Sequence, residues 1–174
     1  MHDTPDLSFD PCFLDAPDEL FQHLVASVEW DTRMRARRTA SFGVAYNYSQ
    51  IDYPATALPD ALQSLCERLH QRLGFLPNNC LLNLYDDGQA SMGFHSDDCS
   101  VLAADTGVAI LSLGSARPIH FRSKADRERE VTWELSPGSL LYMDQAVQAH
   151  WLHAIPRVAS AGPRISLTFR RILR

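Results

Sequence analysis

The chain has 174 residues, a formal net charge of −5, and 45 % hydrophobic and 21 % charged residues. These values are typical of soluble globular chains and argue against a disordered chain, a collagen or a coiled-coil rod. No apolar run approaches the roughly 20 residues that span a bilayer, and the N-terminus lacks a secretory leader. Because its four cysteines form no CxxC pair, we expect reduced thiols in a cytoplasmic protein. The length predicts one domain over residues 1–174, and we expect a monomer.

Charge is distributed unevenly along the chain. Residues 1–31 carry eight acids and no Lys or Arg, so all 16 basic residues come later. The densest basic run spans residues 33–38 and contains four arginines: Arg33, Arg35, Arg37 and Arg38. A local positive field of this kind attracts a polyanion even when the whole chain is acidic. A solvated basic turn is the alternative interpretation of the same run.

Two helices are predicted in the first half of the chain. The segment 15–19 supplies a capping acid (Asp15), an early proline and first-turn carboxylates, and apolar residues follow at helical spacing. A second helix is expected to begin at Pro59 and to end at Gly74, with an apolar stripe between them. We expect both helices to pack against one side of a β-sheet.

Most of the remaining chain is predicted to form short strands separated by turns. Aromatic and small residues mix between 38 and 53, and further strands are expected at 80–85, 108–114, 119–122, 131–135, 139–143 and 164–172. Two helices followed by many short strands predict an α+β, mainly β fold. We expect a sandwich or jelly roll backed by the two N-terminal helices.

A His-x-Asp motif is the first candidate for chemistry. Side chains two residues apart in an extended segment project to the same face, so His95 and Asp97 can reach one ion. A third ligand has to come from elsewhere, and His153 is the best candidate. Two histidines and one carboxylate form the facial triad of non-haem Fe(II) oxygenases, which leaves coordination positions open. A surface or capping role is the alternative for this short motif.

The C-terminal strand is predicted to present two different faces. Its apolar residues are expected to point into the core: Ile165, Leu167 and Phe169. Its polar residues point the other way: Arg164, Ser166, Thr168 and Arg170. Two guanidinium groups with hydroxyls between them suit a bound dicarboxylate through charge-assisted hydrogen bonds. The alternative is an amphipathic edge strand with its polar side in water.

Together these motifs resemble the AlkB family of Fe(II)- and 2-oxoglutarate-dependent dioxygenases. The matching segments follow the family order: Asn83–Tyr85, His95–Asp98, Ser139–Leu141, His150–Pro156 and Pro163–Arg170. A weaker match at residues 38–48 resembles the nucleotide-recognition lid of that family. The resemblance implies a double-stranded β-helix (jelly-roll) core over about 78–174 and a lid over about 33–55.

The resemblance also implies a role for each matching position. Three residues would bind Fe(II): His95, Asp97 and His153, with His150 as the rival third ligand. Six would form the 2-oxoglutarate site: Asn83, Tyr85, Arg164, Ser166, Thr168 and Arg170. Four would contact the substrate: Tyr46, Tyr48, Asp98 and Arg38. Two departures from the family pattern are visible, since Ser166 replaces a common asparagine and Cys99 stands near a position that is often acidic.

The activity implied by the resemblance is oxidative demethylation of N-alkylated bases in DNA or RNA. Such an enzyme would consume O2 and 2-oxoglutarate, release formaldehyde, succinate and CO2, and act on a single-stranded or flipped base. The arginines of the basic run would contact phosphates. Two alternatives remain open: an oxygenase of the same chemistry that acts on a protein, lipid or small molecule, and a β-sandwich binding module without catalysis.

Overall fold

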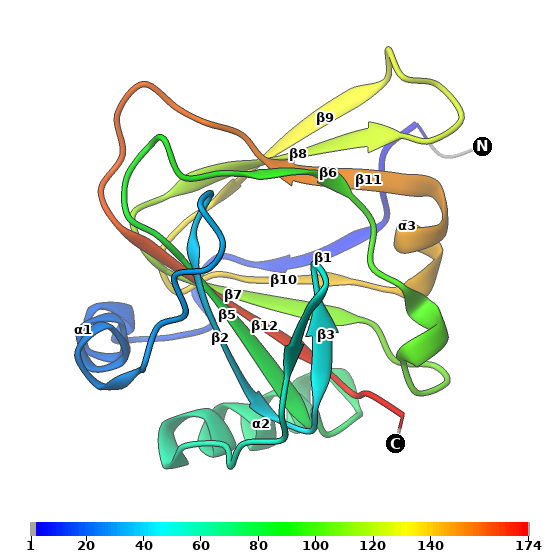
Figure 1. Cartoon of the computed structure of the whole chain (residues 1–174). Coiled ribbons are helices and arrows are strands. Elements are labelled where there is room, and N and C mark those ends of the chain that lie inside the picture. The colour runs from blue at the N-terminus through cyan, green and yellow to red at the C-terminus, as the bar shows by residue number, and fades with distance from the viewer. Residues whose placement is uncertain (1–2, 174) are drawn as a thin grey trace.

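The computed structural model describes residues 3–173 and contains two facing antiparallel β-sheets (Figure 1). The larger sheet has the strand order β1 (Leu7–Asp10), β10 (Leu140–Met143), β7 (Val108–Gly114), β12 (Arg164–Arg170), β5 (Asn79–Tyr85) and β2 (Arg38–Gly43). The smaller sheet has the order β6 (Met92–His95), β11 (Trp151–Ile155), β8 (Arg117–Ser123) and β9 (Glu130–Leu135). This arrangement is a jelly-roll core, as the strand pattern of the sequence predicts.

Two helices cover the outer face of the six-stranded sheet (Figure 1). They are α1 (Pro17–Ser27) and α2 (Asp60–Leu73), and both lie close to the helix positions expected from the sequence. Their buried leucines, among them Leu24, Leu62 and Leu69, share one core cluster with β5, β7 and β12. Gly74 ends α2 in the left-handed conformation, which glycine adopts without steric cost. The start of α1 differs from the prediction, because Ala16 and not an acid occupies the cap position.

A second core cluster fills the space between the two sheets. It contains Phe121 and Ile119 from the small sheet, and Ile110 and Leu141 from the large sheet. Strand β12 lies between β5 and β7 in the middle of the large sheet. All seven of its residues are buried, so its polar face looks into the interior and not into water. The edge-strand alternative for this segment is therefore wrong.

Four elements were not predicted from the sequence. Strand β1 adds residues of the acidic N-terminal segment to the edge of the large sheet. Strands β6 and β11 carry the His-x-Asp region and His153, and the short helix α3 (Gln145–His150) leads directly into β11. These pieces are too short for periodicity to reveal, and pairing with distant strands stabilises them.

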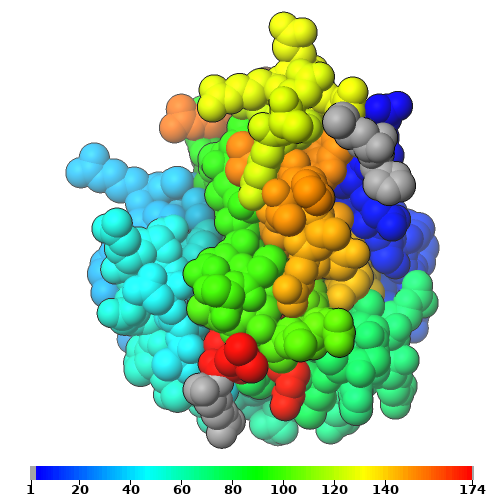
Figure 2. All heavy atoms as spheres, turned by 90° about the vertical axis from the view of Figure 1, so that its right-hand side faces the viewer, coloured from blue at the N-terminus to red at the C-terminus, as the bar shows by residue number. Residues whose placement is uncertain are grey.

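A two-stranded hairpin lies over the open edge of the space between the sheets (Figure 1). It consists of β3 (Tyr46–Tyr48) and β4 (Ile51–Tyr53) and falls within the expected lid. Two segments project from the face seen in Figure 2: the β8–β9 hairpin in yellow and the light-blue loop that precedes β2. Within residues 3–173 no helix is long and apolar enough to cross a membrane.

Candidate active site

Three potential metal ligands meet between the sheets. The ligand atoms of His95, Asp97 and His153 all lie within 4.8 Å of one another, and the two imidazole rings are 4.3 Å apart. His95 ends β6 and His153 lies opposite it on the neighbouring strand β11, so cross-strand pairing brings the two rings together. This donor set is the two-histidine, one-carboxylate combination that suits Fe(II). The rival ligand His150 lies on α3 and lines a separate surface cavity.

The Asp97 carboxylate is held by a buried arginine. Arg170 donates from Nε and Nη2 to Oδ2 of Asp97, at 2.8 and 2.6 Å. The other oxygen, Oδ1, faces the imidazole of His95 at 3.9 Å and stays available to a metal ion. Burial is the largest single influence and opposes ionisation of Asp97, but the charge and hydrogen bonds of Arg170 together with the two histidines hold the pKa below its usual value. The carboxylate is therefore charged at neutral pH, as a metal ligand requires.

The two histidines are also prepared for coordination. The Gly93 carbonyl lies 2.8 Å from Nδ1 of His95, which orients the ring and leaves Nε2 free. Burial, together with repulsion from His95, lowers the pKa of His153 to about 3. The low pKa makes His153 a neutral imidazole at neutral pH, and the contact at Nδ1 leaves Nε2 of His95 for the ligand cluster. A cation therefore need not displace a proton from His153 at neutral pH.

The low pKa of His153 predicts acid sensitivity of the metal-free fold. Below the ordinary value of 6.5 the unfolded chain binds a proton that the folded chain rejects until about pH 3. The free energy of unfolding should therefore fall as the pH drops through this range, by at most about 1.4 kcal/mol per pH unit from this group. Denaturant unfolding between about pH 7 and 5 measures the slope. His153→Gln should show a shallower slope, and equal slopes would contradict the assignment.

A fully buried arginine defines the second part of the pocket. Arg164 donates from Nη2 to Ser112 Oγ at 3.0 Å, whereas its Nε and Nη1 atoms have no hydrogen-bond partner among the described residues. Buried donors of this kind are rare unless a ligand satisfies them. The same pocket is lined by other residues named in the sequence analysis: Asn83, Tyr85, Ser166, Thr168, Arg170 and the three metal-ligand candidates. An anionic ligand next to the metal cluster would fit the unpaired guanidinium.

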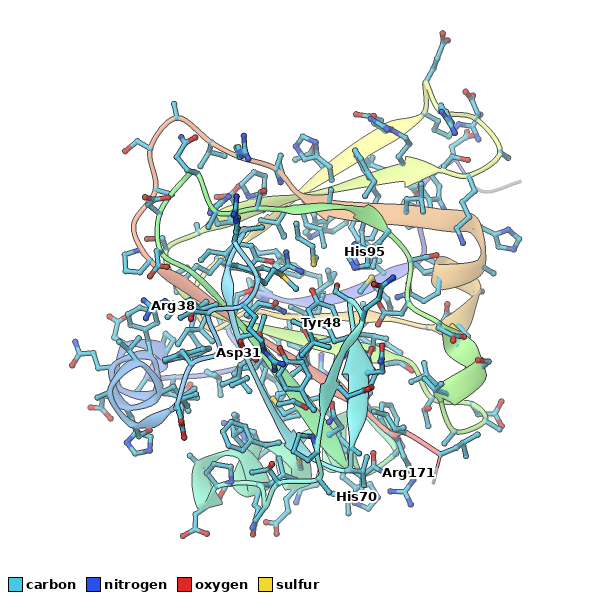
Figure 3. All side chains as sticks on the ribbon, viewed as in Figure 1. Asp31, Arg38, Tyr48, His70, His95 and Arg171 are labelled. Carbon is cyan, nitrogen blue, oxygen red and sulfur yellow. The ribbon has the colours of Figure 1, made fainter. Side chains whose placement is uncertain are left out.

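The lid carries two aromatic rings near the metal cluster, and one of them, Tyr48, also lines the inner pocket. Tyr46 and Tyr48 stack with their centroids 6.4 Å apart, and Arg170 lies 5.0 Å from the ring of Tyr46. Figure 3 shows Tyr48 on the lid side and His95 on the opposite side of the space between the sheets. Both tyrosines and Asp98 line an outer cleft of about 850 Å³, within the usual size range of ligand sites. The aromatic face therefore lies over the entrance to the metal cluster.

The basic run does not form a continuous phosphate-binding surface. Arg37 is buried, and its guanidinium donates to Asn83 Oδ1, the Ser91 carbonyl and the Tyr48 hydroxyl. A phosphate contact for Arg37 is therefore wrong. Arg33 pairs with Asp31, and Arg38 pairs with Asp86 away from the two pockets that meet at the metal cluster (Figure 3).

Sequence reasoning missed three residues that support the site. Gln148 accepts a hydrogen bond from the backbone of Asp97 at 2.8 Å, and Ser112 holds Arg164. Arg37 joins the lid to the co-substrate region through Tyr48 and Asn83. Only Arg37 carried a signal, as part of the basic run, and that signal suggested a different role. The partners of all three lie at least 11 positions away in sequence.

Comparisons with known proteins agree with this geometry. A model of the 2OG-Fe(II) oxygenase superfamily matches residues 17–170. The human protein called DNA oxidative demethylase ALKBH2 is 32 % identical over 90 % of this chain and 69 % of its own length. The chain belongs to the AlkB family of 2OG-Fe(II) oxygenases.

Other relatives of this AlkB-family chain have similar identity. It spans 64 % of the length of bovine ALKBH2, at 32 % identity over 90 % of this chain. The human alpha-ketoglutarate-dependent dioxygenase alkB homolog 3 is 32 % identical over 93 % of this chain and 64 % of its own length. A solved structure of OsALKBH1 shares the fold, with a TM-score of 0.69 and 16 % identity over 97 % of both chains. The family name specifies Fe(II), 2-oxoglutarate and oxygen, and the His-Asp-His cluster and the unpaired Arg164 donors fit these groups.

Proposed function

We propose that this AlkB-family protein oxidatively demethylates N-alkylated bases in DNA or RNA. The observation that carries the proposal is the junction of three features in one space: the His-Asp-His cluster, the unpaired Arg164 donors and the stacked lid tyrosines. The relatives named DNA oxidative demethylase support a nucleic-acid substrate. The products would be formaldehyde, succinate and CO2.

The protein's own residues would prepare and orient the reactants. His95, Asp97 and His153 would hold Fe(II), which supplies the O2-dependent oxidation when bound. Arg170 keeps Asp97 ionised and leaves only Oδ1 free, so the carboxylate would bind through a single oxygen. Gln148 fixes the backbone at the same residue. These contacts limit rearrangement of the ligand set during turnover.

The co-substrate would be anchored by the buried guanidinium of Arg164. Its free Nη1 group can donate to a carboxylate and its Nε to a second acceptor, and Thr168 and Ser166 line the same pocket. Asn83 and Tyr85 complete the wall, while the paired Arg170 contributes its free Nη1. Arg164 is fully buried, which strengthens each charge-assisted contact that it makes.

The substrate base would enter through the cleft under the lid. A base inside a duplex has to be flipped out at a cost of a few kcal/mol, and stacking on an aromatic ring returns about 1–3 kcal/mol. Tyr46 and Tyr48 offer such rings above the metal cluster. Asp98 lines the same cleft, and its Oδ1 accepts from the Ser100 backbone, so the other oxygen would accept from an exocyclic amino group.

Formaldehyde release from methylated oligonucleotides tests the proposal directly. The assay compares a panel of methylated single strands and duplexes with their unmethylated counterparts, with Fe(II) and 2-oxoglutarate present. We expect formaldehyde and succinate in equal amounts from a methylated strand only. Failure of every methylated base to release formaldehyde, while succinate still forms, would reject the nucleic-acid substrate and retain the oxygenase.

One observation favours the alternative of an oxygenase for a protein, lipid or small molecule. Of the four arginines in the basic run, two are ion-paired and Arg37 is buried. Only Arg35 is left without such a contact among the described residues, so attraction to phosphates is weaker than the sequence suggests. The same assay decides between the two functions.

Tyr48→Ala should separate base binding from the rest of the site. Loss of one stacking ring is expected to lower kcat/KM for a methylated oligonucleotide by about 10–100-fold, the equivalent of about 1–3 kcal/mol. Tyr48→Phe keeps the ring and should stay within about threefold of the wild type. The dissociation constants of the metal and of 2-oxoglutarate should not change for either variant. An equal loss of turnover, metal binding and 2-oxoglutarate binding in Tyr48→Ala would show that Tyr48 has a packing role instead.

A further inference from the structure

Arg117 is a buried cation that the proposed chemistry does not use. It begins β8, is fully buried, and does not line the pocket around the metal cluster. Its guanidinium donates to three backbone carbonyls: Asp87 at 3.1 Å, Ala90 at 2.8 Å and Pro156 at 2.7 Å. Its Nε has no partner among residues 3–173. These neutral acceptors hold the group in place without neutralising its charge.

This cation and the anchoring guanidinium of the pocket both lie against the ring of Tyr85. The Cζ atom of Arg117 is 5.5 Å from the centroid of the Tyr85 ring, and that of Arg164 is 5.2 Å from it. The two positive charges therefore lie within about 11 Å of each other. Tyr85 itself lines the pocket, so Arg117 stands directly behind its wall.

The buried charges of this region do not balance. Arg170 is neutralised by Asp97, whereas the structure shows no carboxylate paired with Arg117 or Arg164 in the described part of the chain. A buried charge without a counter-ion is costly, and it persists in a fold when it meets an ion of opposite sign. Arg117 also opposes the charged form of Arg164, because it lowers the pKa of that group in addition to the effect of burial. A dianion in the pocket would relieve both costs.

We propose that Arg117 is a positioning residue for the dicarboxylate co-substrate, which it attracts through a fixed charge behind Tyr85 without touching it. This inference rests on the proposed function, since it assigns 2-oxoglutarate to the Arg164 pocket. The three carbonyls come from the connection between β5 and β6 and from the end of β11. The cation is thus fixed relative to the strands that carry His95 and His153, and it needs no movement when the anion binds.

The size of the effect follows from Coulomb's law. At about 10 Å and an effective dielectric constant of about 20, one unit charge changes the binding constant of an anion by roughly tenfold. Loss of the charge should therefore weaken 2-oxoglutarate binding about tenfold. Metal binding should not weaken, because removal of a positive charge does not reduce the attraction of the site for a cation.

Three substitutions at this position separate charge from packing. Arg117→Met removes the charge and the hydrogen bonds, Arg117→Gln removes the charge but can still donate to one carbonyl, and Arg117→Lys keeps the charge with fewer contacts. Arg157→Met is the matched control, because it removes an exposed arginine from the connection that follows β11. The readout is anaerobic calorimetric titration of 2-oxoglutarate into the full chain loaded with Fe(II), with metal affinity measured separately.

We expect both neutral variants to raise the Kd of 2-oxoglutarate about tenfold, and Arg117→Lys and Arg157→Met to stay within about threefold of the wild type. Wild-type affinity in either folded neutral variant would overturn the inference. So would a loss in Arg117→Lys as large as in the neutral variants, because hydrogen bonding and not charge would then matter. If the wild type itself binds no 2-oxoglutarate, the proposed function fails instead, so the two failures are distinguishable.

Discussion

Replacing Asp97 by asparagine is expected to lower succinate production by more than about 100-fold. Even residues that only orient a metal ligand cost about 10–100-fold when mutated, and Asp97 is itself a candidate ligand. The change should also destabilise the fold by about 3–5 kcal/mol, because it leaves the buried guanidinium of Arg170 without a counter-ion. Metal affinity, succinate production and denaturant unfolding measure the three effects.

A double variant tests whether the loss of metal binding and the loss of stability have separate causes. Adding Arg170→Met to Asp97→Asn removes the unpaired charge and should restore most of the lost stability, since an apolar replacement of a buried ion pair is often neutral. It should not restore metal binding. Asp105→Asn, at an exposed position, serves as the control for removal of a carboxylate. Full succinate production in Asp97→Asn would reject Asp97 as a ligand.

Replacing Arg164 by methionine should have opposite effects on binding and on stability. Truncation of a buried charged partner costs about 2–5 kcal/mol of binding, so the affinity for 2-oxoglutarate should fall by at least about 30-fold. The metal-free protein should keep its stability or gain some, because the variant removes a buried charge that has two unpaired donors. The loss of the hydrogen bond to Ser112 limits that gain to a small value.

Calorimetric titration of 2-oxoglutarate and thermal unfolding of the metal-free protein measure these two effects. Arg164→Lys keeps the charge but not the planar fork of donors, and it should bind the co-substrate with intermediate affinity. A parallel loss of stability and of metal affinity in Arg164→Met would show that Arg164 supports the fold and does not anchor a ligand. Weaker 2-oxoglutarate binding together with unchanged or higher stability would show that Arg164 serves binding at the expense of stability.

Much of the pocket could be predicted because it depends on local periodicity. Alternation along β12 places Arg164 and Arg170 on one face, and the structure directs that face into the pocket. The His-x-Asp motif fixes the relation of His95 to Asp97 in the same way. The sequence indicates His153 as the third ligand, with His150 as its rival. The structure brings His153 to the cluster and leaves His150 on α3.

The sequence by itself determined most of the strands, the two longer helices, the buried and polar faces of β12 and the residue types of the metal cluster. Each of these follows from spacings of a few residues along one element. Only the tertiary structure decided which arginines are buried or ion-paired and which are accessible to a ligand. Arg37 and Arg117 are buried by partners up to 54 positions away, and Arg170 meets Asp97 across 73 positions. Such pairings arise when distant strands close the jelly roll, and composition and periodicity contain no record of them.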